Sequence, residues 1–168
     1  MLLITFVKNL RDGNETKVMF EHPRSFEDVR AMFEEQYGVC NAKSEQDFVC
    51  QGLYSEYRED EEDYTFENVN HLAKEFERCE AEYGERKLKA FFEEYSYQDL
   101  KSLADGSVCI YSSKEAYLDD IYELYGLTDK KFLWTTVDVF LNDDYVFSEI
   151  ETNGDVYQAS NGCIVETI

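Results

Sequence analysis

The sequence predicts an α+β fold made of three small subdomains. Three observations predict it. Segments rich in β-branched and aromatic residues lie near both ends of the chain. Apolar residues recur at helical spacing through the middle, and turn or capping residues separate the two kinds of pattern. We expect a β-sheet with one helix, then a helical middle, then a β-hairpin with helices. Their predicted bounds are 1–57, 58–105 and 106–168.

The first subdomain begins with two strands joined by a turn at Asp12-Gly13-Asn14. Pro23 closes the second strand, and Ser25 with Asp28 resembles a capping box that starts a helix. Gly38 is a natural stop for that helix. The predicted elements are strands over 2–8, 16–22 and 47–54 and a helix from Phe26 to about residue 37.

In the middle subdomain, an acidic run at Glu59–Asp63 is expected to bridge to two helices, and Gly84 separates them. Ser96 and Asp99 cap a third, short helix that ends at Asp105-Gly106. The two longer helices are predicted over 67–83 and 85–95.

The last subdomain has an S-x-x-E box at Ser112 and Glu115 before a helix, and two Asn-Gly turns near its end. Residues 129–141 fit a helix by spacing and a strand by composition, and we predict a helix. The predicted elements are a strand over 107–111, a helix over 113–125, a loop at 142–144, an extended segment over 146–152, and a hairpin of 155–160 with 163–168.

Acidic residues dominate the composition, with 37 Asp and Glu against 16 Lys and Arg and a formal charge of −21. Solubility of a small domain needs a charge of only about 2–8. Residues 1–50 carry nine acids and six bases, residues 51–100 fifteen and six, and residues 101–168 thirteen and four. This balance excludes nucleic acid and anionic membranes as partners and favours a basic protein or cations.

The five cysteines are an odd number at wide spacing without a C-x-x-C pair. They fit free thiols in a reducing cytosol better than disulfides or a zinc site. The apolar opening is too short for a signal peptide, and no apolar run reaches the 18 residues of a membrane span. We expect a soluble, cytoplasmic protein.

Motifs of catalysis are missing from the sequence. It contains no G-x-S-x-G, Walker loop, H-E-x-x-H or G-x-G-x-x-G, and neither His22 nor His71 has a Cys or Ser at motif spacing. No EF-hand loop is complete, although residues 59–63 would bind Ca²⁺ or Mg²⁺ weakly and nonspecifically. We therefore expect no enzyme activity, no cofactor and no designed metal site.

Carboxylates are densest from Glu56 to Glu82, where eleven of 27 residues are acidic. In the helix over 113–125, acids at i, i+4 and i+8 share one side at steps of about 6 Å, close to the separation of phosphates along a DNA strand. These acids form either a solvated surface or an imitation of the DNA backbone. The candidate partner-binding acids are Glu56, Glu59, Asp60, Glu61, Glu62, Asp63, Glu67, Glu75, Glu82, Glu115, Asp119, Asp120, Glu123, Asp138, Asp143 and Asp144.

Two groups of tyrosines, at 54, 57 and 64 and at 117, 122 and 125, also have two interpretations. They pack in the core, or the second group lies at a subunit interface, where Tyr is enriched. The candidates for a dimer interface are Tyr122, Tyr125, Phe132, Trp134 and Phe140.

The length, the acidity and the order of elements resemble the ArdA-type antirestriction family of DNA mimics, which mobile elements and phages carry. The resemblance covers nearly the whole chain, and the 129–145 segment is the part that departs from the family. Four segments carry it: 19–33, Phe66–Phe76, 107–126 and 155–168.

This resemblance implies an elongated chain of three subdomains that pairs through the last one into a homodimer. The dimer would occupy the DNA groove of a Type I restriction-modification enzyme as a competitive inhibitor. Two chains of −21 carry −42, the charge of roughly 70 Å or 21 base pairs of duplex DNA. In the family, the region that matches 129–145 contributes to the antirestriction motif and to dimer contacts.

Three other functions fit parts of the sequence. An acidic mimic of this kind could instead inhibit a CRISPR effector, a nucleoid protein or a repressor, since each offers a basic groove. A hydrolase that uses paired carboxylates would need a defined pocket. A halophilic housekeeping protein would lose stability at low salt, but the aromatic and cysteine content fits that class poorly.

Overall fold

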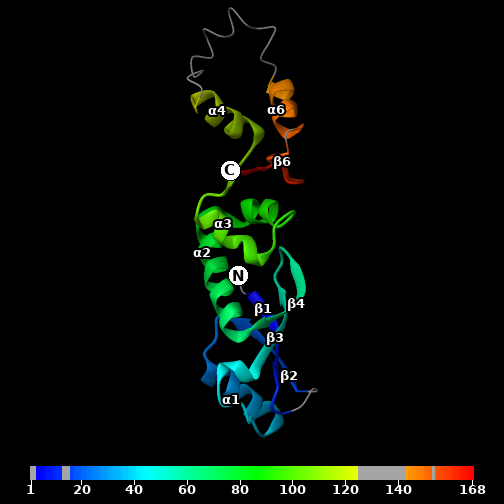
Figure 1. Cartoon of the computed structure of the whole chain (residues 1–168), viewed down its shortest axis with the longest axis vertical. Coiled ribbons are helices and arrows are strands. Elements are labelled where there is room, and N and C mark those ends of the chain that lie inside the picture. Colours follow the sequence, from blue (N-terminus) through cyan, green and yellow to red (C-terminus); the bar gives the residue numbers. More distant parts are fainter. Residues whose placement is uncertain (1–2, 13–15, 125–142, 153) are drawn as a thin grey trace, which may run out of the picture. The chain divides into compact units, whose positions relative to one another are not determined.

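The computed structural model describes residues 3–12, 16–124, 143–152 and 154–168. They form a mixed α+β structure with two antiparallel sheets, which confirms the predicted class (Figure 1). The chain divides into two compact units. Unit 1 comprises residues up to Glu82 together with Ser96–Lys101, and unit 2 comprises Tyr83–Tyr95 together with Ser102–Ile168. The division into three subdomains and the elongated shape stay predictions.

Unit 1 contains a four-stranded antiparallel sheet in the order β2-β1-β3-β4. In β1 and β2 buried and more exposed residues alternate, so one face of the sheet carries the core residues. Both strands and β3 were predicted. The strands are β1 (Leu3–Asn9), β2 (Lys17–His22), β3 (Phe48–Tyr54) and β4 (Glu59–Thr65).

Gly52 interrupts the regular pairing of β3. The register shifts there on both sides, toward β1 and toward β4, and Glu61 and Glu62 have no partner in β3. Gly52 has φ +70°, and a Cβ at this position would lie 2.5 Å from the Tyr54 hydroxyl oxygen. Only glycine adopts this backbone and leaves room for that ring.

Helices cover the core face of this sheet (Figure 1). Helix α1 (Phe26–Tyr37) starts at the predicted Ser25–Asp28 capping box and ends at Gly38, which has φ +79°. Helix α2 (Phe66–Phe91) is interrupted at Gly84, where φ 75° and ψ 166° are not helical, so the predicted break is confirmed. The short helices are η1 (Glu45–Asp47), η2 (Tyr97–Asp99) and α3 (Leu100–Ala104).

Aromatic rings fill the core of unit 1. Phe33 and Phe48 stack with centroids 5.6 Å apart, and Phe66 packs on Phe48 at 5.8 Å. All three are at most 2% exposed. Burial of such rings supplies most of the stabilisation of a domain of this size.

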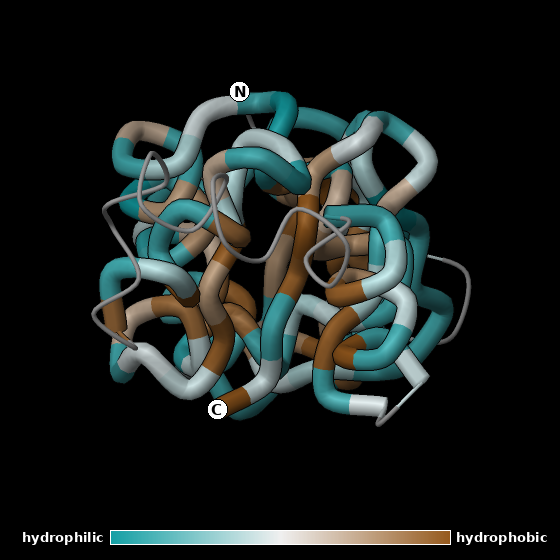
Figure 2. The backbone as a smooth tube through the Cα atoms, turned by 90° about the horizontal axis from the view of Figure 1, so that it is seen from above, coloured by the Kyte–Doolittle hydropathy of each residue, from teal (hydrophilic) through white to brown (hydrophobic). Residues whose placement is uncertain are grey.

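Unit 2 contains a three-stranded antiparallel sheet in the order β5-β7-β6, and β6 and β7 form the predicted closing hairpin. Its core joins Tyr117, Leu118 and Tyr122 to Phe147 and Ile164. Along the tube of Figure 2, hydrophobic and hydrophilic stretches alternate, as expected of elements with one buried side. The elements are β5 (Val108–Tyr111), α4 (Lys114–Leu124), α6 (Asp143–Thr152), β6 (Val156–Gln158) and β7 (Ile164–Thr167).

Four local predictions are wrong. The acidic run at 59–63 is a strand, β4, and not a bridge, because its pairing with β3 outweighs the low strand propensity of acids. Residues 146–152 belong to helix α6 and not to an extended segment. Asp143 and Asp144, expected in a loop, form the first turn of the same helix. Ser113, and not Ser112, caps α4, since its hydroxyl accepts a hydrogen bond from the Ala116 N–H at 3.2 Å. Residues 129–141 lie outside the described residues.

Among the described residues, no helix has the length and apolar character that crossing a membrane requires.

Candidate acidic interaction surface

The five consecutive acids form most of β4, the edge strand of the unit 1 sheet. Glu59, Glu61, Glu62 and Asp63 are exposed, and Asp60 is half-buried. Among the described residues, Glu59, Glu61 and Asp63 take part in no ion pair. A charged edge strand discourages edge-to-edge aggregation, so this placement alone has a structural explanation as well as a functional one.

Three predicted acids lie on the part of α2 that belongs to unit 1. Glu67 and Glu82 are exposed, and Glu75 is half-buried. Glu75 accepts a hydrogen bond from Arg78 at 2.8 Å, so its charge is compensated. Glu56, in the turn before β4, is exposed. The structure therefore brings the β4 acids together through the strand, whereas the α2 acids are a more dispersed group.

In unit 2, helix α4 separates its acidic side from its apolar side. Asp119, Asp120 and Glu123 are exposed, whereas Tyr117 and Leu118 are each 1% exposed. Asp119 and Glu123 are four residues apart, and their mutual repulsion costs about 0.2–0.5 kcal/mol in an isolated helix. Glu123 also lies in the last turn of α4, where the helix dipole disfavours a negative charge.

Glu115 has a second role at the start of α4. A backbone hydrogen bond at Glu115 itself, followed by one with Ser113, lowers the pKa of its carboxyl below the ordinary value. An acid in the first turn also interacts favourably with the helix dipole. Glu115 thus helps to form the helix. The sequence had indicated only a role in partner binding for this residue.

The first turn of α6 adds two carboxylates next to α4. Asp143 accepts a hydrogen bond from the Tyr122 hydroxyl at 2.8 Å, and Asp144 pairs with Lys114. The Lys114 ammonium also lies 5.9 Å from the centre of the Phe147 ring. Lys114 is the only cation among the described residues from 102 onward, where eleven acids occur.

Tyrosine hydroxyls hold several of the carboxylates. Tyr64 donates to Asp60 at 2.7 Å, and Tyr57 donates to Glu80 at 3.1 Å. Glu166 accepts from Tyr111 and Tyr117, both at 3.2 Å. A hydroxyl donor fixes the position of a carboxylate without neutralising its charge. Burial, followed by the bond to Asp143, raises the pKa of Tyr122 to about 12, so this donor stays protonated at neutral pH.

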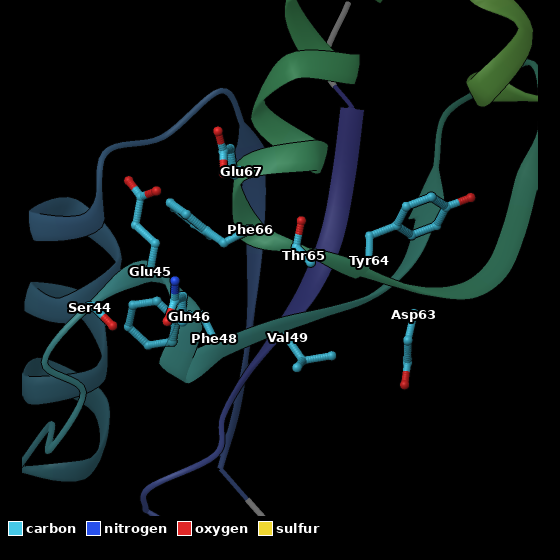
Figure 3. A pocket seen from close by; sticks show the side chains of 10 residues that line it. All are labelled: Ser44, Glu45, Gln46, Phe48, Val49, Asp63, Tyr64, Thr65, Phe66 and Glu67. Carbon is cyan, nitrogen blue, oxygen red and sulfur yellow. The ribbon is translucent and has the colours of Figure 1, made fainter.

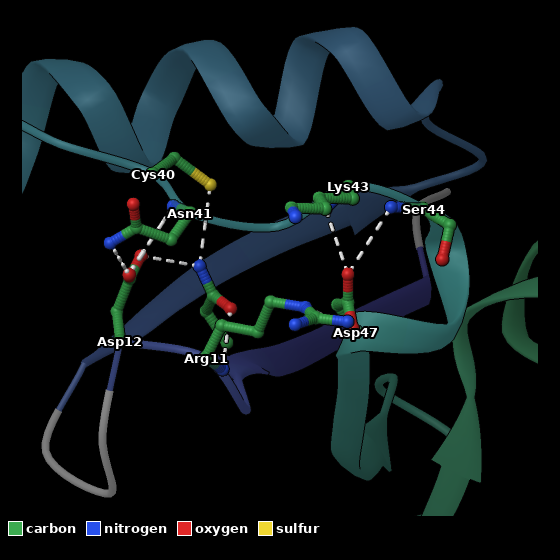
Figure 4. Close-up of polar contacts among 8 residues, drawn as sticks. Arg11, Asp12, Cys40, Asn41, Lys43, Ser44 and Asp47 are labelled. Atoms are coloured by element: carbon green, nitrogen blue, oxygen red, sulfur yellow. Dashed lines mark hydrogen bonds and ion pairs between the residues drawn. The ribbon is translucent and has the colours of Figure 1, made fainter.

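Carboxylates near α1 are held differently (Figure 4). Asp47 pairs with Arg11 at 2.7 Å, and Asp12 accepts a hydrogen bond from the side chain of Asn41 at 2.5 Å. The hydrogen bond and the charge of Arg11 lower the pKa of Asp47, as does the Lys43 N–H. Asp12 and Asp47 thus fix loops within unit 1, and Arg11 compensates the charge of Asp47.

The predicted interface residues divide between described and undescribed parts of the chain. Tyr122 is 7% exposed in the core of unit 2. The other four interface candidates and one candidate acid lie outside the described residues: Tyr125, Phe132, Trp134, Phe140 and Asp138.

Sequence reasoning missed the tyrosine donors and two of the carboxylates they hold, Glu80 and Glu166. Tyr117 and Glu166 are 49 residues apart in sequence, and no local spacing indicates their contact. The excess of Tyr in a chain with few cations was the available signal.

One cleft of about 800 Å³ lies where β3 and β4 meet α2 (Figure 3). Aromatic, acidic and small polar side chains line it, and no histidine, cysteine or lysine is among them. Burial raises the pKa of Cys50 to about 12, so its thiol is not a nucleophile. No group of three or more potential metal ligands occurs in the described part of the chain.

Known protein families and curated proteins offer no match to this chain. The resemblance to the ArdA-type family therefore stays a prediction.

Proposed function

We propose that the chain is a DNA mimic that inhibits a Type I restriction-modification enzyme by occupying its DNA-binding groove. The observation that carries this proposal is the set of exposed carboxylates on β4 and α4, of which Glu59, Glu61, Asp63 and Glu123 take part in no ion pair with described residues. Charges of this density cost stability. Presenting them to a basic protein surface gives them a function that a solvated surface lacks.

The local geometry supports a fixed pattern of charge. Strand pairing holds the backbone of β4, and the core contacts of Tyr117 and Leu118 hold α4. Tyrosine hydroxyls orient Asp60 and Asp143. Carboxylates that are already positioned lose less side-chain entropy on binding, and they can take the place of phosphates against the Lys and Arg residues of the enzyme.

The mechanism is competition without chemistry. Binding would release counterions from both charged surfaces, as it does when protein meets DNA, so affinity should fall steeply as salt rises. In this proposal the chain acts in the cytoplasm as a homodimer, and the dimer extends the acidic surface to the length of a DNA site.

A restriction assay tests the proposal. Purified Type I enzyme is incubated with unmodified DNA, with and without the chain, at increasing NaCl. We expect cleavage and enzyme–DNA association to be blocked at low salt and restored as salt rises. Unchanged cleavage at every salt concentration would contradict the proposal. Inhibition of a CRISPR effector or a repressor in the same assay format, without effect on the Type I enzyme, would assign the mimic to that other target.

A further inference from the structure

The unit 1 sheet has a second face that no described helix covers. Residues on this outer face alternate with the core residues along each strand, and the register aligns them in three rows. The rows run from β2 through β1 and β3 to β4. They are Glu21, Ile4, Tyr54 and Glu59; Met19, Phe6, Gln51 and Asp63; and Lys17, Lys8, Val49 and Thr65.

Apolar side chains occupy the middle of the outer face. Met19 is 58% exposed and Phe6 is 39% exposed. Phe6 also meets the Tyr54 ring edge-on, with centroids 5.8 Å apart. Such side chains are normally covered in a two-layer domain, because a sheet face buries its apolar residues against another element. Exposed apolar groups ringed by polar residues are typical of interaction sites.

A polar atom in the same face lacks a partner. The side-chain oxygen of Gln51 is buried and accepts no hydrogen bond from the described residues. Gln51 lies in the middle row, between Phe6 and Asp63. A buried acceptor without a donor costs about 1–3 kcal/mol, so this part of the face is less stable than a fully satisfied sheet.

Charge on the outer face is unevenly distributed. Glu59 and Asp63 lie along β4 and take part in no ion pair with described residues. Glu21 on β2 pairs with Arg24 at 3.8 Å, whereas Lys8 and Lys17 face each other across β1 and β2. Like charges directly opposite each other in a sheet are destabilising. A partner that fits must therefore bring cations over β4 and an anion over the Lys8–Lys17 pair.

We propose that the outer face docks an amphipathic helix of a partner protein. Its apolar stripe would lie over Phe6 and Tyr54, with Arg or Lys on the flank over β4 and an acid at the end over Lys8 and Lys17. The inner face of the same sheet already packs against helices, so the sheet has the twist that suits one. A second copy of the chain is not the occupant, because the homodimer proposed above pairs through the last subdomain and not through the unit 1 sheet.

The size of the outer face sets the kind of complex. Four strands and three rows span about 20 Å by 20 Å, or roughly 400 Å², about half of what one partner contributes to a standard interface. A helix of about 14 residues covers this length. The contact is accordingly a weak, reversible one, and it does not depend on the proposed inhibition of a restriction enzyme.

Titration with synthetic peptides tests this inference on the full chain. One 14-residue helical peptide carries a leucine stripe, arginines on one flank and a glutamate at one end, and its matched control has serine at every leucine position. Backbone amide shifts in NMR spectra locate binding. We expect the leucine peptide to shift residues of the outer face and to bind about ten-fold more tightly than the serine peptide. Equal affinities of the two peptides would overturn the proposal, and so would shifts along α4. Either result would show that charge attraction alone causes binding.

Two variants locate the site independently of the shifts. Met19→Ser removes an exposed methionine from the outer face, and Met32→Ser removes one that is 42% exposed on α1. We expect leucine-peptide binding to weaken about three-fold or more for Met19→Ser and to stay unchanged for Met32→Ser. Equal effects of the two substitutions would contradict the site. Light scattering detects self-association of the chain. Self-association through the same residues would show that a second copy occupies the outer face, and it would overturn the proposal.

Discussion

Helices α1 and α4 are of similar length and both follow a serine cap, yet their carboxylates have different partners. In α1, Glu34 pairs with Arg30 at 3.1 Å, and Asp28 closes the capping box with Ser25. In α4 the only lysine pairs with Asp144 of α6, and Glu123 has no ion pair among described residues. Asp28 and Glu34 of α1 thus serve the local fold. In α4, Glu115 supports the start of the helix, but Glu123 lies at its end, where the helix dipole disfavours a negative charge. The charge of Glu123 is thus available to a partner outside the chain.

The same contrast extends to the strands. Asp47 in the loop before β3 pairs with Arg11, whereas Glu59, Glu61 and Asp63 on β4 pair with no described cation. In the acidic regions, tyrosine hydroxyls hold several of the carboxylates, as in the bond from Tyr122 to Asp143. Regions whose carboxylates are held so differently should also differ in stability and in function.

The largest effect on stability is expected at Gly52, which lies beside the acidic edge strand. An alanine there would need a left-handed backbone and would place Cβ 2.5 Å from the Tyr54 hydroxyl oxygen. Gly52→Ala should lower the free energy of unfolding by about 2–5 kcal/mol, from backbone strain and overpacking together. Gly38→Ala, at the end of α1, has φ +79° and no atom within 4 Å. It should cost only about 1–2 kcal/mol. Urea unfolding measures both, and equal losses would show that the Tyr54 contact has no role.

Acidification should affect unit 1 before unit 2. Burial lowers the pKa of His22 below its ordinary value of 6.5, and the charge of Arg24 lowers it further, against the hydrogen bond with Asn70. The unfolded chain therefore binds the proton more readily. Stability is lost as pH falls below about 6.5, by at most about 1.4 kcal/mol per pH unit.

Hydrogen exchange between pH 7.5 and 5.5 checks this prediction. Amides of β2 should lose protection relative to those of β7, because neither histidine of the chain is in unit 2. His71→Gln changes an exposed histidine and should leave the difference intact. Equal loss of protection in both sheets would rule out His22 as the cause.

A smaller effect separates the two helices directly. Glu123→Lys places a cation four residues after Asp119 and in the last turn of α4, so it should stabilise the fold by about 0.5–1 kcal/mol. Arg30→Gln removes the pair with Glu34 in α1 and should destabilise it by about 0.3–0.5 kcal/mol. In a restriction assay the ranking should reverse, with Glu123→Lys the weaker inhibitor. If the more stable variant were also the stronger inhibitor, that result would contradict the contrast between α1 and α4.

The smallest effect is expected from a single neutral substitution. Asp119→Asn removes one exposed charge among many, and rim charges contribute little individually. Its inhibition should stay within about two-fold of the unchanged chain. A loss of more than ten-fold would mean that the surface contains a dominant contact at Asp119 and that charge is not its main feature.

Local signals in the sequence were sufficient for much of the fold. The Ser25–Asp28 box and Gly38 bound α1, and β-branched and aromatic residues on both sides of a turn indicated β1 and β2. β4 could not be predicted, because five acids have poor strand propensity and only pairing with β3 makes them a strand. In α6, Val146 and Ile150 are β-branched residues that favour a strand by propensity, so the helix was not predicted. Asp143 and Asp144 at its start were a usable sign, since acids favour the first turn.

The candidate surface was predictable in its exposed acids but not in what holds them. Exposure of Glu59, Asp63 and Glu123 follows from their charge alone. The donors to Asp60 and Asp143 are tyrosines that sequence reasoning assigned to core packing or to an interface. These contacts depend on tertiary structure, so a single sequence contains no spacing that reveals them.

The central claim is tested most directly by removing the same number of charges from β4 in one variant and from α1 in another. Glu59→Gln/Glu61→Gln/Asp63→Asn neutralises three uncompensated acids of β4, and Glu27→Gln/Glu34→Gln/Glu35→Gln neutralises three exposed acids of α1. Inhibition of DNA binding by a Type I restriction enzyme is then titrated for both variants at one salt concentration. We predict a loss of about ten-fold or more for the β4 variant and less than about two-fold for the α1 variant. Equal losses would show that only net charge matters and would contradict the account.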